Sequence, residues 1–366
     1  MEEWKEYKLG EVLTIKYGKD HKQLADGDIP IYGSGGIMRY GERSLYDGPS
    51  ILIPRKGSLN NVIYADKPFW TVDTMFWSII NDSIANPLFV YYSICKKDFA
   101  SLNVGSAVPS LTVPVIEDID ILLPSKATQD KVVSVLKSLD DKIELNRHIN
   151  DNLEQQAQAL FNYYFIDTPE LLGEFSVGSL ADAANYVNGL AMQKYRPISG
   201  EKGLPVLKIK ELGQGRIDSS SDFCSNEIDS YYKVYDGDVI FSWSGTLIVK
   251  IWCGGKCGLN QHLFKVSSKT TPKWFYYFWT KHHLDNFIRI AKDKAVTMGH
   301  IKREELEKAE VLFPNNSVMK KLDTLMAPFL DQIIEKECEI RKLALLRDTL
   351  LPKLISGELV INDINN

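Results

Sequence analysis

Cys253 and Cys257 have the spacing of paired ligands in a zinc site. They flank Gly-Gly-Lys, and Cys224 or His262 could supply a third ligand. A structural zinc site needs a second Cys or His pair, however, and none accompanies this one. We therefore favour a turn between two strands that carries incidental thiols, and we predict no metal site.

Two other motifs have part of the pattern of a cofactor site. Gly33-Ser-Gly-Gly36 is rich in glycine, but no Gly-Lys-Ser/Thr ending or GxGxxG spacing follows, which favours an ordinary turn. Asn86-Pro-Leu-Phe89 resembles the Asn-Pro-Pro-Tyr/Phe loop of amino-methyltransferases, but its third residue is Leu and no glycine-rich cofactor loop precedes it. We interpret this motif as the start of a helix.

The remaining residues do not complete a catalytic site. No histidine lies in an HExxH motif or in a nucleophile–base arrangement, and no Gly-x-Ser-x-Gly motif is present. No acidic cluster is followed by the Glu-x-Lys of a nuclease. The predicted class is therefore a binding or assembly protein without catalytic residues.

Polar residues in the predicted loops have the chemistry of DNA contacts. Arg reads guanine and Asn or Gln reads adenine by paired hydrogen bonds, while Lys and Ser suit phosphates. For each single residue, an ordinary solvated loop position is the alternative. In residues 1–124 the candidates are Lys19, Lys22, Ser34, Arg39, Arg55, Lys56, Ser58, Asn60, Asn61, Ser106 and Ser110. In the second half they are Asn188, Gln193, Lys194, Arg196, Lys208, Lys210, Ser242, Trp243, Ser244, Thr246, Lys292, Lys294, Thr297, His300 and Lys302.

Two long helices are predicted to position these loops. Residues 126–166 contain no Gly or Pro, and their apolar residues recur at alternating steps of four and three, which is a heptad seam. About 38 helical residues would make a rod of roughly 57 Å. The seam continues at the same positions 190 residues later, which indicates an internal duplication. The apolar residues predicted to form the seam are Leu136, Leu139, Ile143, Leu153 and Leu160 in the first helix. In the second helix they are Met326, Phe329, Ile333, Leu343 and Leu350.

Asn146 and Asn150 interrupt the seam of the first helix. If the helices run antiparallel, both residues come near Lys336 and Ile340. A polar seam residue usually sets the register of the two helices. Alternatively, these side chains lie in water at the edge of the seam, because a 3.6-residue helical period drifts away from 3.5.

The globular parts share a framework and differ between its motifs. Tyr46-Asp-Gly48 recurs as Tyr235-Asp-Gly237, and Val108-Pro-Ser-Leu111 aligns with Met298-Gly-His-Ile301. Short strand-like runs alternate with turns, so we predict α+β units. The predicted divisions are a first globular unit (1–124), a central long helix (125–167), a second globular unit (168–314), a C-terminal long helix (315–359) and a tail (360–366).

Composition sets limits on the partners. The 366 residues are 44% hydrophobic and 25% charged, and the net charge of −5 argues against binding nucleic acid by bulk electrostatics alone. Five scattered cysteines predict no disulfide framework, and the sequence has neither an apolar run of membrane-spanning length nor the pattern of a signal peptide at its start. The expected compartment is the cytoplasm.

The whole chain resembles the specificity subunit of type I DNA restriction-modification systems. The most specific match is the ending Leu345-Leu-Arg-Asp-Thr-Leu-Leu-Pro-Lys-Leu-Ile-Ser-Gly-Glu-Leu359, which is similar to the C-terminal conserved helix of that family. The start, Trp4 with Lys8-Leu-Gly-Glu11, its echo Val177-Gly-Ser-Leu180, and the Tyr-Asp-Gly framework also fit.

This resemblance implies an α+β, pseudo-twofold molecule, in which two antiparallel coiled-coil helices join and separate two target-recognition domains. Each domain would read one half of a bipartite, asymmetric DNA target. The implied partners are double-stranded DNA, two methyltransferase subunits and, in some complexes, two restriction subunits. The chain itself would hold no cofactor; S-adenosylmethionine, ATP and Mg would belong to the partners. The alternative is a coiled-coil adaptor whose two domains bind protein or glycan.

Overall fold

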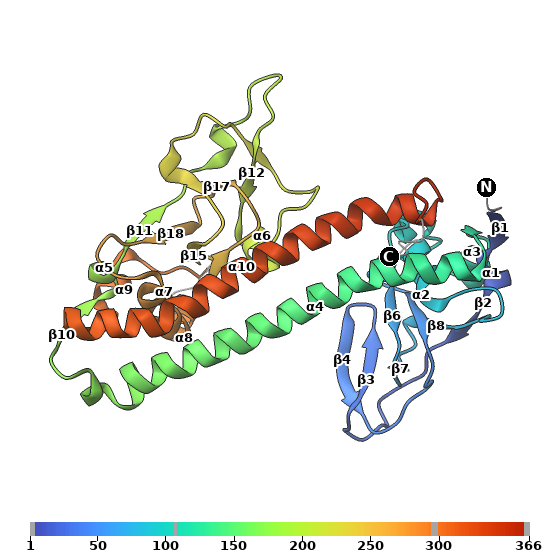
Figure 1. Cartoon of the computed structure of the whole chain (residues 1–366), viewed down its shortest axis with the longest axis horizontal. Coiled ribbons are helices and arrows are strands. Elements are labelled where there is room, and N and C mark those ends of the chain that lie inside the picture. Colours follow the sequence, from blue (N-terminus) through green and yellow to red (C-terminus); the bar gives the residue numbers. More distant parts are fainter. Residues whose placement is uncertain (1–3, 106–107, 294–298, 362–366) are drawn as a thin grey trace, which may run out of the picture. The chain divides into compact units, whose positions relative to one another are not determined.

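The computed structural model describes residues 4–105, 108–293 and 299–361 (Figure 1). By its contacts the chain divides into two compact units, one of Met1–Asp141 with Leu345–Asn366 and one of Lys142–Ala344. Each unit therefore contains a globular part together with a piece of both long helices. This division groups each piece of helix with the globular part on which it packs, and the predicted limits between recognition domains and helices stay a prediction.

The two long helices are α4 (Lys126–Asn162) and α10 (Asn316–Ile355). In the second unit, Asn150 Nδ2 of α4 donates to Glu337 Oε1 of α10 at 2.9 Å, and Lys142 Nζ lies 3.8 Å from Glu339 Oε1. The partner number on α10 rises as the number on α4 falls. The predicted antiparallel pairing of the helices is therefore confirmed.

The seam residues face the interior of each unit. None of the predicted apolar seam residues of either helix is exposed. Asn146 is fully buried and Asn150 is 6% exposed, so the interpretation that they lie in water at the edge of the seam is wrong. Asn150 also contacts the carbonyl oxygen of Ile333, about two helical turns away from the predicted Ile340.

The first unit contains two sheets and a two-stranded ribbon. The larger sheet has the order β2 (Leu13–Tyr17), β8 (Met75–Ile80), β5 (Ser50–Pro54) and β6 (Ile63–Ala65), all antiparallel. The smaller sheet has the order β4 (Gly36–Gly41), β3 (Ile29–Gly33) and β7 (Trp70–Thr71), with β3 and β7 parallel. The ribbon pairs β1 (Lys5–Lys8) with β9 (Asp120–Leu123).

The second unit repeats this topology. Its larger sheet has the order β11 (Asn185–Asn188), β18 (Leu263–Ser267), β15 (Asp238–Ser242) and β16 (Ile248–Trp252). Its smaller sheet has the order β13 (Phe223–Cys224), β12 (Leu204–Leu207), β17 (Cys257–Leu259) and β14 (Lys233–Val234), with β12 and β17 parallel. Its ribbon pairs β10 (Phe175–Ser179) with β19 (Glu310–Pro314). The predicted fold class, two similar α+β units with two long helices, is confirmed.

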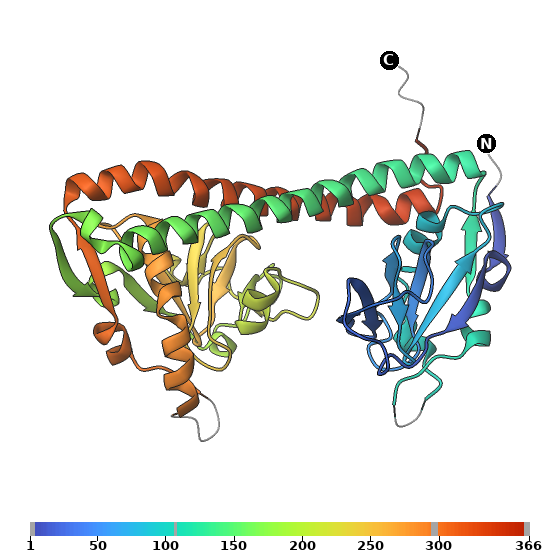
Figure 2. The same ribbon diagram turned by 90° about the horizontal axis from the view of Figure 1, so that it is seen from below.

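Short helices cover these sheets. Asn86 caps α2 (Pro87–Ile94) by accepting hydrogen bonds from the N–H groups of Leu88 and Phe89, so the Asn-Pro motif is a helix start as predicted. In the second unit, α7 (Lys273–His282) and α8 (Leu284–Asp293) lie beside the larger sheet (Figure 2). The remaining short helices are α1 (Leu9–Val12), α3 (Val113–Glu117), α5 (Leu180–Ala183), α6 (Ile209–Gln214) and α9 (Arg303–Lys308).

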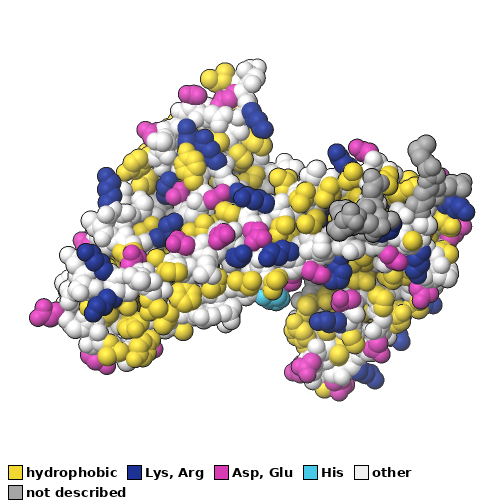
Figure 3. Space-filling model, viewed as in Figure 1, with side chains coloured by type: hydrophobic (Ala, Val, Ile, Leu, Met, Phe, Trp, Pro, Cys, Tyr) yellow, Lys and Arg dark blue, Asp and Glu magenta, His cyan; other side chains and the backbone are white. Residues whose placement is uncertain are grey.

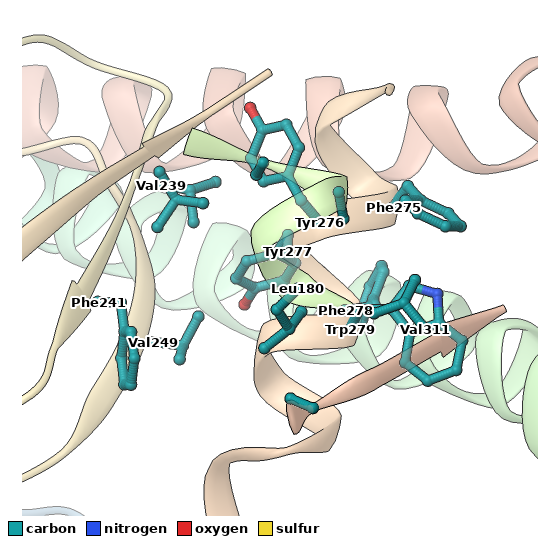
Figure 4. Close-up of a cluster of buried hydrophobic side chains, with 14 of the residues drawn as sticks. Leu180, Val239, Phe241, Val249, Phe275, Tyr276, Tyr277, Phe278, Trp279 and Val311 are labelled. Carbon is teal, nitrogen blue, oxygen red and sulfur yellow. The ribbon is translucent and has the colours of Figure 1, made fainter. Parts of the chain in front are cut away.

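Each globular part shares its core with the long helices. In the second unit, the aromatic face of α7 carries Phe275, Phe278 and Trp279 (Figure 4), and the Phe278 ring stacks on Phe161 of α4 with centroids 5.6 Å apart. In the first unit, Phe89 of α2 belongs to one core with Leu136 of α4 and with Leu351 and Leu354 of α10. The loops that carry the candidate contact residues are therefore mounted on a scaffold that includes both helices.

Equivalent tyrosines attach the covering helices to α4. Tyr92 of α2 donates to Asp140 Oδ2 at 2.6 Å, and Tyr277 of α7 donates to Glu154 Oε1 at 2.7 Å. Lys281 Nζ also donates to Glu154 Oε1 at 2.7 Å. Burial acts to raise the pKa of Glu154, but the hydrogen bonds from Lys281 and Tyr277 outweigh it and hold this pKa below the ordinary value.

We predict that Glu154→Gln lowers stability at neutral pH but not in acid. A carboxylate whose pKa is depressed in the folded state stabilises above its unfolded pKa of about 4.3, and loses that contribution as pH falls through the folded value. Because about a third of the side chain is exposed, we expect a loss of about 1 kcal/mol. The melting temperatures of the wild type and of Glu154→Gln, measured from pH 7 to pH 3.5, should converge as the pH falls.

Glu144→Gln is the matched control for this change. Glu144 pairs with Arg147 on the exposed surface of the same helix, so its loss should be nearly neutral at every pH. A deficit of Glu154→Gln that stayed constant down to pH 3.5 would contradict the electrostatic explanation.

Candidate nucleic-acid interface

In the first unit, candidate residues from three loops meet. Lys56, after β5, forms an isolated antiparallel bridge with Ser110. Asn61 Nδ2 donates to the carbonyl oxygen of Ser34, in the turn between β3 and β4, at 2.9 Å. We call this surface the first loop cluster, and it contains Ser34, Arg55, Lys56, Asn61 and Ser110.

Arg55 is the cation in this cluster that the fold holds most closely. Its guanidinium lies 5.5 Å from the ring centroid of Tyr17, and Nη1 donates to the carbonyl oxygen of Asp73 at 3.2 Å. Its backbone oxygen accepts from the N–H of Leu111 at 2.9 Å. The other guanidinium N–H groups have no hydrogen-bond partner among the described residues, so Arg55 presents free donors from a fixed position.

Other candidates of the first unit use their polar groups within the chain. Arg39 donates to two backbone carbonyl groups and to Asp26 Oδ1, the last at 3.0 Å. Asn60 donates to Asp98 Oδ1 at 3.1 Å and accepts from a backbone N–H. These contacts hold the loops in shape and leave fewer groups for a ligand.

The second unit has a loop cluster at the same place in its topology. Ser244, after β15, forms an isolated bridge with His300, as Lys56 does with Ser110. Trp243 Nε1 donates to Asn188 Oδ1 at 3.0 Å, and the Trp243 ring centroid lies 6.3 Å from that of His300. We call this surface the second loop cluster, and it contains Asn188, Trp243, Ser244, Thr246 and His300.

Two serine candidates of the second unit are buried. Ser242 is fully buried, and its Oγ donates to the carbonyl oxygen of Ser244 at 3.1 Å. Ser244 itself is 4% exposed. In this structure both hydroxyls belong to the interior of the turn after β15, and neither faces solvent.

Gln193, Arg196 and Lys208 come together around a cavity of about 380 Å³ in the second unit. The cavity lies between the segment that follows β11 and the smaller sheet. Arg196 and Gln193 are exposed, and neither side chain has a hydrogen-bond partner among the described residues. The cavity therefore collects free donors on one surface.

The remaining candidates lie singly. Lys210 pairs with Asp218 at 3.1 Å. Outside the clusters, the exposed candidates whose side chains have no partner among the described residues are Lys19, Lys22, Ser58, Lys194, Lys292 and Lys302, and the same holds for Lys56 and Thr246 within the clusters. Ser106, Lys294 and Thr297 lie outside the described residues.

Three side chains beside these clusters were not among the predicted contacts. Tyr17 ends β2 and is 56% exposed under the Arg55 guanidinium. Asp222 and Phe223 line the cavity with Arg196. A large aromatic next to Gly18-Lys19 could have marked Tyr17, but nothing in the local sequence marks the other two, because the pairing of β12 with β13 places them.

The surface charge is mixed. On the face of the described residues that Figure 3 shows, Lys and Arg side chains alternate with Asp and Glu and form no continuous basic band. On this face, binding of DNA would therefore depend on local contacts or on partners that supply positive charge.

The cysteine motif forms the predicted turn between β16 and β17. Burial raises the pKa of the Cys253 thiol to about 12, and it also raises the pKa of the buried Cys257, so both thiols are protonated at neutral pH. Among the described residues, no group of three or more His, Cys, Asp or Glu side chains could hold a metal ion. No helix of the described chain is long and apolar enough to span a membrane.

Comparison with known proteins gives a single family. The model of the type I restriction modification DNA specificity domain matches residues 1–155 and 173–346. The chain is 26% identical to the specificity subunit of the type I restriction enzyme MjaIX of Methanocaldococcus jannaschii, over 98% of this chain and 89% of that protein. It is also 26% identical to the EcoBI specificity subunit of Escherichia coli, over 50% of this chain and 39% of that protein.

A solved structure shows the same fold. The crystal structure of the type I restriction-modification system S subunit from M. genitalium aligns with a TM-score of 0.62 and 14% identity, over 97% of this chain and 96% of that chain. At this identity the match concerns the fold alone.

Proposed function

The chain belongs to the family of type I restriction-modification DNA specificity subunits, and we propose that each of its two units reads one half of a bipartite, asymmetric DNA target. The family match covers both halves of the chain, so the resemblance seen in the sequence is confirmed. We assign the reading of bases to the first and second loop clusters and to the cavity beside Arg196.

The observation that supports this proposal is a repeated scaffold that carries different contact residues. The larger sheets have the same strand order, and Lys56–Ser110 and Ser244–His300 are equivalent bridges. The side chains that these bridges offer to a ligand nevertheless differ: Lys56 is the exposed residue of the first bridge, and His300 is the exposed residue of the second, where Ser244 is buried. One fold with two different sets of donors suits two different half-targets, because base identity is read by the pattern of donors and acceptors.

Partner subunits complete the proposed assembly. The long helices would dock two methyltransferase subunits that carry S-adenosylmethionine, and restriction subunits using ATP and Mg would join some complexes. The chain itself would bind and orient DNA without catalysis. A net charge of −5 is consistent with this division of labour, since the partners would contribute many of the phosphate contacts.

The deciding experiment is a map of DNA methylation in a host that expresses the chain with its methyltransferase partner. We expect methylated adenine at a split motif that disappears when the chain is omitted. The methyltransferase expressed alone is the control. An assembled complex that gives no chain-dependent methylation would favour the adaptor interpretation instead.

A further inference from the structure

The cavity in the second unit combines groups of opposite character. Its cations are Arg196 and Lys208, its anion is Asp222, and Phe223 forms part of the rim. Asn260 also lines the cavity and is only 7% exposed, and its Oδ1 accepts from the backbone N–H of His262 at 3.3 Å. A surface that bound only phosphates would not need a carboxylate among its cations.

Asp222 is a fixed acceptor in this cavity. Its Oδ2 pairs with Lys208 Nζ. The hydrogen bond and the charge of Lys208 hold the pKa of Asp222 below its ordinary value, so the carboxylate is ionised at neutral pH. An ionised carboxylate accepts hydrogen bonds and donates none. It therefore repels phosphate and carbonyl oxygens and attracts an amino group.

Arg196 supplies the opposite pattern. Its guanidinium forms no hydrogen bond with any described residue, whereas Arg39 of the first unit donates to four acceptors within the chain. Phe223 lines the cavity and is 52% exposed, so its ring is open to contact with a ligand there. The cavity thus offers the unpaired N–H donors of the Arg196 guanidinium, the ionised carboxylate of Asp222 as an acceptor, and the exposed ring of Phe223.

These groups match the major-groove edge of one base pair. Guanine presents two acceptors, O6 and N7, that a guanidinium binds together, and its partner cytosine presents the N4 amino donor that a carboxylate accepts. An A·T pair with thymine at Asp222 would place the O4 acceptor against a carboxylate. We propose that this cavity reads a G·C pair of the second half-target, an inference that rests on the proposed function. Arg196 would donate to guanine O6 and N7, and Asp222 would accept from cytosine N4.

The test uses methylation maps of the full complex with Asp222→Asn and, separately, Arg196→Ala. Asn keeps the size of Asp but adds an amide donor and removes the charge, so it no longer selects an amino group. Both variants should relax the same position of the second half, a G·C pair in the wild-type motif, with the preference for that pair falling about tenfold or more. The first half should stay unchanged and serves as an internal measure of folding.

Asp218→Asn is the matched control, because Asp218 pairs with Lys210 in the same unit and does not line the cavity. It should leave both halves intact. The proposal would be overturned if the two variants relaxed base preference at two different positions or at an A·T pair. A uniform loss of methylation over all second-half sequences would overturn it as well. An unchanged split motif in both variants would overturn it while leaving the proposed function standing. Absence of any split motif in the wild-type complex would overturn both.

Discussion

Arg55→Ala should relax the first half of the methylated motif at one position and leave the second half as it was. The fold has already fixed this guanidinium, through the Tyr17 ring at 5.5 Å and the Asp73 carbonyl oxygen at 3.2 Å. Little side-chain entropy is therefore left to lose when it binds a base. Removing one bidentate arginine contact costs about 1–3 kcal/mol of discrimination, so the preference should fall by about one order of magnitude.

Two neighbouring substitutions separate the possible roles of Arg55. Arg55→Lys keeps the charge but loses the planar fork, so it should relax the same position with a smaller loss of overall affinity. Lys56→Ala removes an exposed ammonium group that suits a phosphate, and it should weaken binding to all sequences alike. Both should be measured by methylation mapping and by DNA binding at two salt concentrations.

The measured pattern decides between specific and general effects. Arg39→Ala provides the structural control, because it removes contacts that hold the segment between β2 and β3 against β4, and it should lower thermal stability without changing the sequence read. If Arg55→Ala weakened methylation equally for every first-half sequence, or altered the second half, its assignment as a base-reading residue would be wrong.

The scaffold was predictable because its signals are periodic or repeated. The heptad seam predicted α4 and α10. The offset near 190 residues predicted a second copy of each element. The alignment of Val108-Pro-Ser-Leu111 with Met298-Gly-His-Ile301 also anticipated that Ser110 and His300 occupy equivalent positions. Such patterns survive in the sequence because every turn of helix and every strand must keep its apolar face.

The state of each candidate side chain was not predictable from its type. Arg39 and Arg196 look alike in the sequence, yet Arg39 donates to four acceptors in the segment between β2 and β3, and Arg196 donates to none among the described residues. Ser242 has the hydroxyl of a phosphate contact, but sheet pairing buries it completely. Residue chemistry thus marks the loops correctly as polar, while only the folded structure shows which donors remain free.

The sequence left undecided whether Asn146 lies inside the seam or in water at its edge. In the structure it is buried, and this burial affects stability. Both atoms of its amide group are buried and form no hydrogen bond of good geometry among the described residues, and the amide lies beside Glu339, whose pKa it helps to lower. An unsatisfied buried amide costs about 1–3 kcal/mol, so stability alone would favour a hydrophobic residue here. A polar residue in a seam disfavours sliding of one helix along the other. The two helices then pair in one register, so the length over which they run side by side is fixed.

This fixed length leads to the second large effect, a longer gap between the half-targets. We predict that seven residues inserted in both helices, after Asp141 in α4 and after Ala344 in α10, preserve both half-sequences and lengthen the gap. These positions are the limits between the compact units, so each unit keeps its own pieces of helix and its core. A seven-residue insertion keeps the heptad phase of the seam.

The expected change in the gap follows from helix geometry. Seven residues add about 10 Å to each helix, which corresponds to at most about three base pairs along DNA. Insertion in α10 alone is the control: the unmatched residues would have to bulge from the seam, so this variant should lose thermal stability and methylation together. If the paired insertion methylated the original motif with its original gap, the helices would not determine the spacing. A changed half-sequence would show instead that the loops depend on helix length, which the separate cores of the two units argue against.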